Sequence, residues 1–94
     1  MKLRWTEPAL RHLHEAYDYV QLDKPDAAAR LIDRIEAAVE RLRIFPQMGR
    51  ASARPNTREL AVSGTPFIII YRVMNNVLEI LAIFHGAQNW QNKL

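Results

Sequence analysis

The fold is decided by the stretch PFIIIYRVMNNVLEILAIFH, which covers residues 66–85. It holds two apolar runs, roughly residues 66–74 and 77–85, and each is rich in the β-branched and aromatic residues that strands favour. Asn75 and Asn76 separate the runs, and asparagine tolerates the positive φ that a two-residue type I′ loop requires. The stretch therefore predicts an antiparallel hairpin that is closed by these two asparagines.

The two-residue loop also predicts which residues of the hairpin stand opposite each other. The expected pairs are Met74 with Val77, Val73 with Leu78, Arg72 with Glu79, Tyr71 with Ile80, Ile69 with Ala82, and Phe67 with Phe84. The face that includes Tyr71, Ala82 and Phe84 is then wholly apolar or aromatic, and we expect it to cover the helices. The other face carries Arg72 among aliphatic residues and has His85 at its end. It is too apolar to be bare to water, which indicates either a binding surface or partial cover by the chain's own C-terminus.

Two amphipathic helices are expected before the hairpin. Thr6 should cap the first, whose apolar stripe consists of Leu10, Leu13, Tyr17 and Val20. Asp23 should cap the second, whose stripe consists of Ala28, Leu31, Ile32, Ile35, Val39 and Leu42. Because only a few residues connect them, the two helices should form an antiparallel hairpin.

Two shorter strands complete the expected elements. Residues 1–5 alternate between apolar and basic side chains, which predicts a strand with one buried face. Pro46 cannot continue the second helix, so an irregular polar segment should run from there to Pro55. Residues 57–63 should then form a strand that precedes the hairpin. With 94 residues and 49% hydrophobic side chains, the whole chain, 1–94, should be one domain with one small core.

Composition excludes several classes of protein. There is no cysteine, which excludes disulfides and thiolate chemistry and fits a reducing cytosol. Charged residues interrupt the N-terminal segment, so we expect no signal peptide. The longest apolar stretch is far too short to span a bilayer, so we expect a cytoplasmic protein without membrane contact.

The two halves of the chain differ in charge. Residues 1–40 hold six Lys/Arg and eight Asp/Glu, a balance of −2, whereas residues 41–94 hold seven and two, a balance of +5. Five arginines and no acid lie in the segment from Arg41 to Arg58. Such a segment would attract an acidic peptide or nucleic acid, or would be a solvated basic loop.

Few side chains suit a metal, a cofactor or a nucleophile. His12 and His14 point to different sides of a helix without metal-ligand spacing, so both are interpreted as surface residues. The three glycines are scattered and no nucleophile motif is present, so no cofactor is expected. Trp90 is expected to pack against the domain.

The residues that remain as candidates for chemistry are Arg50, Arg54, Arg58, Arg72 and His85. Arginines with a histidine could bind a phosphate and transfer protons, which metal-free RNA cleavage requires. The alternative is that Arg72 simply pairs with Glu79 across the hairpin and that His85 caps the end of the sheet.

The order of these features resembles the toxins of the ParE/RelE superfamily along nearly the whole chain. The resemblance is carried by Phe45-Pro46, Gly49-Arg50, Arg58-Glu59-Leu60, Tyr71-Arg72-Val73 and His85. It implies an α+β fold, in which a two-helix antiparallel hairpin packs on a small, mostly antiparallel sheet. It also implies the toxin of a type II toxin–antitoxin pair, as in plasmid stabilisation proteins. The partner would be a cognate antitoxin with a DNA-binding part and a tail that wraps the toxin.

The superfamily contains two mechanisms. The RelE-like branch cuts mRNA on the ribosome, and the ParE-like branch acts on DNA gyrase. The basic positions of the RNA-cutting branch correspond here to Glu59, Ala61, Ile68 and Ala87. These differences favour the ParE-like branch. The alternatives are a ribosome-dependent mRNA endoribonuclease with Arg72 and His85 as catalytic residues, and a degenerate member that only binds its antitoxin.

The surface expected to bind the antitoxin or the target combines the basic segment with the semi-apolar face of the hairpin. Its residues are Arg50, Arg54, Arg58, Ile70, Arg72 and Leu81. Apolar contacts would supply most of the affinity, and the arginines would speed and orient the association.

Overall fold

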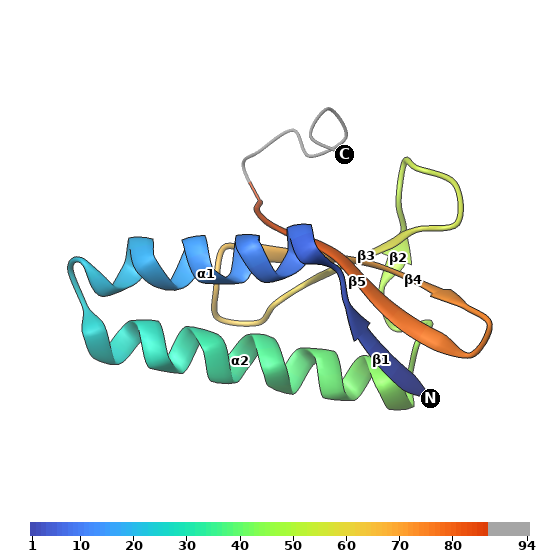
Figure 1. Cartoon of the computed structure of the whole chain (residues 1–94), viewed down its shortest axis with the longest axis horizontal. Coiled ribbons are helices and arrows are strands. Elements are labelled where there is room, and N and C mark those ends of the chain that lie inside the picture. The colour runs from blue at the N-terminus through green and yellow to red at the C-terminus, as the bar shows by residue number, and fades with distance from the viewer. Residues whose placement is uncertain (87–94) are drawn as a thin grey trace.

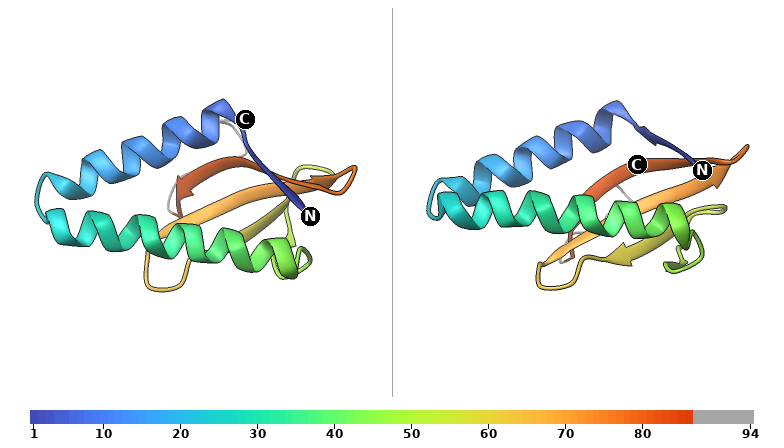
Figure 2. Two further views of the ribbon diagram at one scale, coloured as in Figure 1. Left: turned by 60° about the horizontal axis from the view of Figure 1, so that its bottom comes forward. Right: turned by 90° about the horizontal axis from the view of Figure 1, so that it is seen from below.

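The computed structural model describes residues 1–86. The elements are β1 (Lys2–Trp5), α1 (Glu7–Gln21), α2 (Pro25–Ile44), β2 (Arg50–Ala51), β3 (Arg58–Ala61), β4 (Phe67–Met74) and β5 (Val77–His85). The strands form one sheet in the order β1-β5-β4-β3-β2 (Figure 1). All neighbouring strands are antiparallel except β1 and β5, which are parallel. Figure 2 shows α1 and α2 side by side on one face of the sheet, so the predicted α+β arrangement is confirmed.

The start of α1 was predicted correctly, whereas the start of α2 was not. The Thr6 hydroxyl oxygen accepts a hydrogen bond from the backbone N–H of Ala9 at 3.3 Å, as a helix cap does. The prediction that Asp23 caps α2 is wrong, because the residue before the helix is Lys24 and no side chain caps it. Pro25 begins the helix instead, and its ring presets the helical φ without adding an N–H that needs a partner.

The main core lies between the helices and the sheet. Its buried residues are Ala9, Ala16, Leu31, Ile35, Ala38, Val39, Leu42, Val62, Ile69, Tyr71, Leu78, Ile80 and Ile83. The deepest positions of α1 are the alanines, since small side chains let the helix lie close to β5. Leu10, which was predicted in the apolar stripe, is 44% exposed.

The turn end of the β4–β5 hairpin has the predicted register. Asn75 and Asn76 adopt φ values of 53° and 60°, which are the left-handed conformations of a type I′ loop. Arg72 stands opposite Glu79, and Tyr71 is fully buried in the core under the helices.

The other end of the hairpin differs from the prediction because β5 contains one extra residue. Tyr71 stands opposite Ile80, but its neighbour Ile70 stands opposite Ala82. Leu81 between them has no partner in the register, which is the pattern of a β-bulge. Each residue of β5 after Leu81 therefore points to the face opposite to the predicted one.

The bulge produces a second buried cluster. The pairs of the shifted half are Ile69 with Ile83, Ile68 with Phe84, and Phe67 with His85. Ala82 and Phe84 were predicted to cover the helices, but they lie on the opposite face. There they form a cluster with Ile70, against which Ile68 and Leu81 pack. Ile70, which was predicted to lie on the binding surface, is fully buried in this cluster.

The remaining strands are shorter than predicted. The strand expected over residues 57–63 covers only Arg58–Ala61, and the segment expected to be irregular contains the two-residue strand β2. Neither described helix combines the length and the apolar character that crossing a membrane would need. Ala87, Trp90 and the alternative in which the C-terminus covers the sheet fall on residues 87–94, which lie outside the described residues.

Candidate functional site

The helix-free face of the sheet carries an ion group that spans three strands. The Arg72 Nε donates to Glu79 Oε1 at 2.6 Å, and the other carboxylate oxygen of Glu79 accepts from Arg4. Glu79 is 5% exposed, and a buried carboxylate of this kind is tolerated only when it is paired. The interpretation that Arg72 pairs with Glu79 is therefore confirmed, and the group of two arginines and one glutamate has a net charge of +1.

A second ion pair lies on the same face, across β2 and β3. The Arg50 Nε and Nη2 both approach Glu59 Oε1, at 2.6 Å and 2.5 Å. Glu59 is 9% exposed, whereas the Arg50 side chain is largely in solvent. The carboxylate of Glu59 therefore neutralises the charge of the neighbouring Arg50.

The arginines of the basic segment have different environments. Arg58 Nη1 donates to the Gly49 carbonyl oxygen at 2.8 Å, and its side chain lines a cavity of about 390 Å³ together with Arg72. Arg54 is exposed in the loop before β3, where its carbonyl oxygen accepts from the Thr57 hydroxyl at 2.8 Å. Of the predicted binding residues, the structure thus brings Arg58 and Arg72 to one cavity. Leu81 is half-buried at the bulge.

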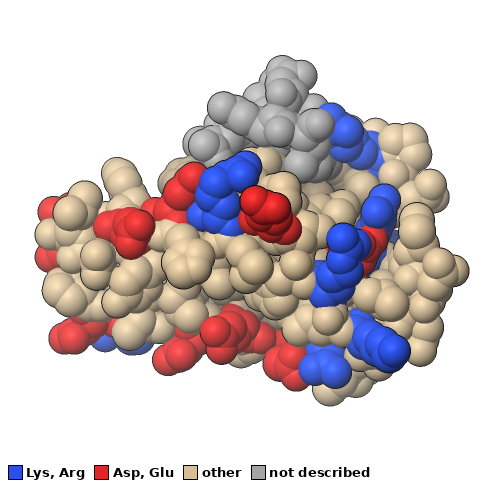
Figure 3. Space-filling model, in the orientation of Figure 1, with Lys and Arg blue, Asp and Glu red and all other residues tan. Residues whose placement is uncertain are grey.

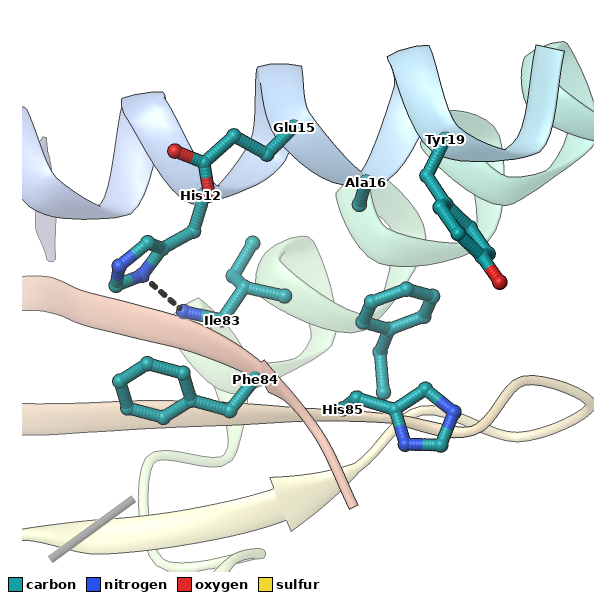
Figure 4. A pocket seen from close by; sticks show the side chains of 8 residues that line it. His12, Glu15, Ala16, Tyr19, Ile83, Phe84 and His85 are labelled. Carbon is teal, nitrogen blue, oxygen red and sulfur yellow. Dashed lines mark hydrogen bonds between the residues drawn. The ribbon is translucent and has the colours of Figure 1, made fainter. Parts of the chain in front are cut away.

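His85 does not share a face with Arg72, so that prediction is wrong. Its pairing partner Phe67 is on the helix side of β4, four residues before Tyr71, and the rings of Phe67 and His85 are 5.8 Å apart. Figure 4 shows His85 at the end of β5, on the side of the strand where Tyr19 of α1 lies. Tyr19 and His85 both line a cavity of about 490 Å³ between α1 and β5.

His12 has a structural contact that sequence reasoning missed. Its Nδ1 accepts a hydrogen bond from the backbone N–H of Ile83 at 3.2 Å, and its ring lies 4.8 Å from that of Phe84 (Figure 4). β1 ends at Trp5, opposite Ile80, and among residues 1–86 no strand lies beside the edge of β5 beyond that pair, which α1 covers instead. Burial lowers the pKa of His12 from its ordinary value of 6.5, which favours the neutral ring that can accept this bond. The interpretation of His12 as a surface residue is therefore wrong, whereas His14 is exposed as expected.

Tyr71 holds the loop after α2 against the sheet. Its hydroxyl donates to the Pro46 carbonyl oxygen at 2.7 Å and accepts from the Gly49 N–H at 2.9 Å. A Cβ atom on Gly49 would lie 2.5 Å from that hydroxyl and 2.8 Å from the Glu59 carbonyl oxygen, so only glycine fits there. Burial raises the pKa of Tyr71, which keeps the hydroxyl protonated. The Phe-Pro-x-x-Gly motif thus has a structural role, in which its backbone binds a tyrosine hydroxyl.

Charge is distributed unevenly over the surface. In Figure 3 the acidic side chains lie mainly over the helical layer, and most visible Lys and Arg side chains lie toward the end of the molecule that carries β1 and the β4–β5 turn. The same end exposes apolar side chains, among them Ile44, Phe45, Met48, Val73 and Met74. Apolar and basic groups together are typical of a surface that binds an acidic protein segment.

Known proteins resemble this chain in sequence. Residues 3–90 match the family described as the ParE toxin of type II toxin–antitoxin system, parDE. The candidate toxin Y4kP of Sinorhizobium fredii is 44% identical over 93 residues, which is 99% of this chain and 96% of that protein. Toxin RelE2 of Caulobacter vibrioides is 36% identical over 84 residues, which is 89% of this chain and 93% of that protein.

Solved structures resemble it in fold. A chain of the chromosomal ParDE toxin–antitoxin system of P. aeruginosa superimposes with a TM-score of 0.76 at 30% identity, covering 90% of this chain and 95% of that one. A chain of the E. coli RelBE toxin–antitoxin complex superimposes with a TM-score of 0.67, covering 93% and 98%. At 11% identity, this second likeness concerns the fold alone.

Proposed function

Because the chain belongs to the ParE toxin family of type II toxin–antitoxin systems, we propose that it inhibits DNA gyrase by binding it, and that it does not cut RNA. A binding toxin needs a complementary surface, whereas metal-free RNA cleavage needs a base, an acid and cationic groups around one phosphate.

The observation that carries the proposal is the separation of Arg72 from His85. They lie on opposite faces of the sheet, because the bulge at Leu81 turns His85 toward the helices. One phosphate could not contact both side chains without a rearrangement of the strand. In addition, Arg72 is already bonded to the Glu79 carboxylate at 2.6 Å, so a phosphate would have to compete with that ion pair for the guanidinium.

A cognate antitoxin is the expected second partner. The ParDE structure that this chain matches at 30% identity belongs to a toxin–antitoxin system, and the basic and apolar end of this chain suits a segment that carries acids and large apolar residues. Arg50, Arg54 and Arg58 remain the predicted basic contacts. Ile70 is buried, so a charge placed there would disturb the fold before it tested binding.

The alternative, a ribosome-dependent mRNA endoribonuclease, is kept because a relative at 36% identity is named toxin RelE2. The two functions predict different damage in cells. Inhibition of gyrase should block DNA supercoiling and induce a DNA-damage response. Cleavage of mRNA should stop translation first.

The deciding experiment combines a gyrase supercoiling assay on the purified toxin with primer extension on ribosome-bound messages. We expect inhibition of supercoiling, its reversal by the antitoxin, and no new message ends. The His85→Ala variant should inhibit supercoiling as the parent does, because His85 lies away from the helix-free face. Codon-specific cleavage that disappears in both Arg72→Ala and His85→Ala would contradict the proposal and establish the endoribonuclease.

A further inference from the structure

The edge of β4 next to the hairpin turn has no strand beside it among the described residues. β3 begins at Arg58, which stands opposite Tyr71, so the following residues of β4, 72–74, extend beyond it. On their other side these residues pair with β5. A short length of sheet edge is therefore available near the basic end of the molecule.

The backbone groups of Val73 point toward this open edge. Phe67 accepts from Val62 N at 2.9 Å, on the β3 side, whereas Pro66 accepts from Gly86 N at 2.6 Å, on the β5 side. Because successive residues of a strand direct their N–H and C=O to opposite sides, the odd-numbered residues of β4 bond toward β3. Val73 is the next odd residue after Tyr71, so its N–H and C=O face the side where β3 is missing.

A cavity of about 390 Å³ adjoins this edge and suits an acidic ligand. Its lining residues include Pro46, Thr57, Arg58, Arg72 and Val73. Val73 is 44% exposed. Arg58 bonds to a carbonyl oxygen, and no ion pair of the described residues supplies it with a carboxylate. Arg72 shares the single charge of Glu79 with Arg4, so the cavity is bordered by uncompensated positive charge.

We propose that an extended segment of the antitoxin adds to β4 at Val73 and places a carboxylate against Arg58. The backbone of one antitoxin residue would bond to the N–H and C=O of Val73, as in other cases of strand addition. An acidic side chain of the segment would contact the Arg58 guanidinium, and an apolar one would pack on Val73 and Pro46. Only the identity of the occupant depends on the proposed function, since gyrase inhibition plays no part in the contact.

Amide hydrogen exchange tests the contact directly. The toxin is prepared alone and in complex with its cognate antitoxin, and exchange is followed for each amide by NMR. We expect exchange at Val73 to slow by about ten-fold or more in the complex, because its N–H gains a partner. Ala61 is the matched control, since it is an exposed residue whose N–H points away from β4 at the outer edge of β3. Its rate should change little.

Substitution of Arg58 tests the charge. Arg58→Gln should speed dissociation of the complex by about ten-fold, the effect of losing one hydrogen bond to a charged group. Arg30→Gln is the control, because Arg30 lies in α2 fourteen residues before the last helical residue, Ile44, roughly 21 Å along the helix from the end that leads to the cavity. The NMR spectrum of free Arg58→Gln shows whether it folds. If it does not, the exchange experiment on the parent still decides.

Three outcomes would overturn the proposal. Val73 could exchange equally fast in the free toxin and in the complex. It could already be protected in the free toxin in a concentration-dependent way, which would make a second copy of this chain the occupant. Folded Arg58→Gln could dissociate at the parental rate. Each of these would leave gyrase inhibition to be judged by the supercoiling assay alone.

Discussion

Removing the Tyr71 hydroxyl should destabilise the fold measurably, although only one oxygen atom is lost. In Tyr71→Phe the ring still fills its fully buried site, so the packing of the core is unchanged. The hydroxyl bonds to Gly49 N–H at 2.9 Å and to the Pro46 carbonyl oxygen at 2.7 Å would both disappear. Gly49 is buried and its N–H would lack a partner, whereas Pro46 is half-buried and water could replace part of its bond.

The magnitude follows from these two environments. A buried polar group left without a partner costs about 1–3 kcal/mol, and an ordinary hydrogen bond contributes about 0.5–1.5 kcal/mol net. We therefore expect Tyr71→Phe to lower the free energy of unfolding by about 2–3 kcal/mol. For a domain of this size, that corresponds to a decrease in Tm of roughly 10–20 °C.

Urea denaturation with linear extrapolation measures the change, and Tyr19→Phe is the matched control. Tyr19 is 77% exposed, so its variant should differ from the parent by less than about 0.5 kcal/mol. If Tyr71→Phe is equally neutral, the hydroxyl does not hold the loop and the reasoning is refuted.

A double-mutant cycle adds a second test of the same contact. Gly49→Ala would place its Cβ 2.5 Å from the Tyr71 hydroxyl oxygen, 2.8 Å from a ring carbon and 2.8 Å from the Glu59 carbonyl oxygen. Tyr71→Phe removes only the first of these clashes. We therefore expect the two substitutions together to destabilise by less than the sum of their separate effects. Simple additivity would show that Gly49 and Tyr71 do not interact.

Three further predictions concern the titrating groups and the helix cap. The folded-state pKa of His12 lies below 6.5, so its contribution to stability should be complete above pH 6.5 and decline as the pH falls through the folded pKa. The free energies of unfolding of the parent and of His12→Gln, measured by urea titration, should therefore differ at neutral pH and converge in acid. The folded-state pKa of Tyr71 lies above 10.0, so its contribution should be complete below that pH and decline as the pH rises further, and a base titration of Tyr71→Phe should lack this decline. Thr6→Ala removes the cap of α1 together with the hydroxyl's bonds to the Ile80 and Leu81 carbonyl oxygens, so it should cost at least about 1 kcal/mol in the same denaturation assay, whereas Thr6→Ser, which keeps the hydroxyl, should cost less.

Much of the architecture could be predicted from local sequence. The two asparagines predict the hairpin loop because few other residues tolerate two successive positive φ values. Arg72 and Glu79 determine the register near that loop, since a shift by one residue would turn a charge into the core. The apolar stripe of α2 likewise predicts which face of that helix is buried, because the polar side chains on its other faces must remain in water.

The far half of the hairpin could not be predicted in this way. From Ile80 to Phe84 every residue of β5 is apolar, so a change of face places no charge in the core. The alternation of polar and apolar residues, which reveals register elsewhere, carries no information over such a run. The bulge at Leu81 was therefore invisible in the sequence, and with it the side of the sheet on which His85 lies.

The contacts that define the site were also decided by the tertiary structure. Gly49 and Tyr71 are 22 residues apart, and His12 and Ile83 are 71 residues apart, so no local pattern reports either bond. The sequence by itself determined the elements, the helix-facing side of the hairpin near its turn, the pairing of Arg72 with Glu79, and the family resemblance. Only the packed sheet decided that Arg72 and His85 stand on opposite faces, because that separation depends on one extra residue within a uniformly apolar strand.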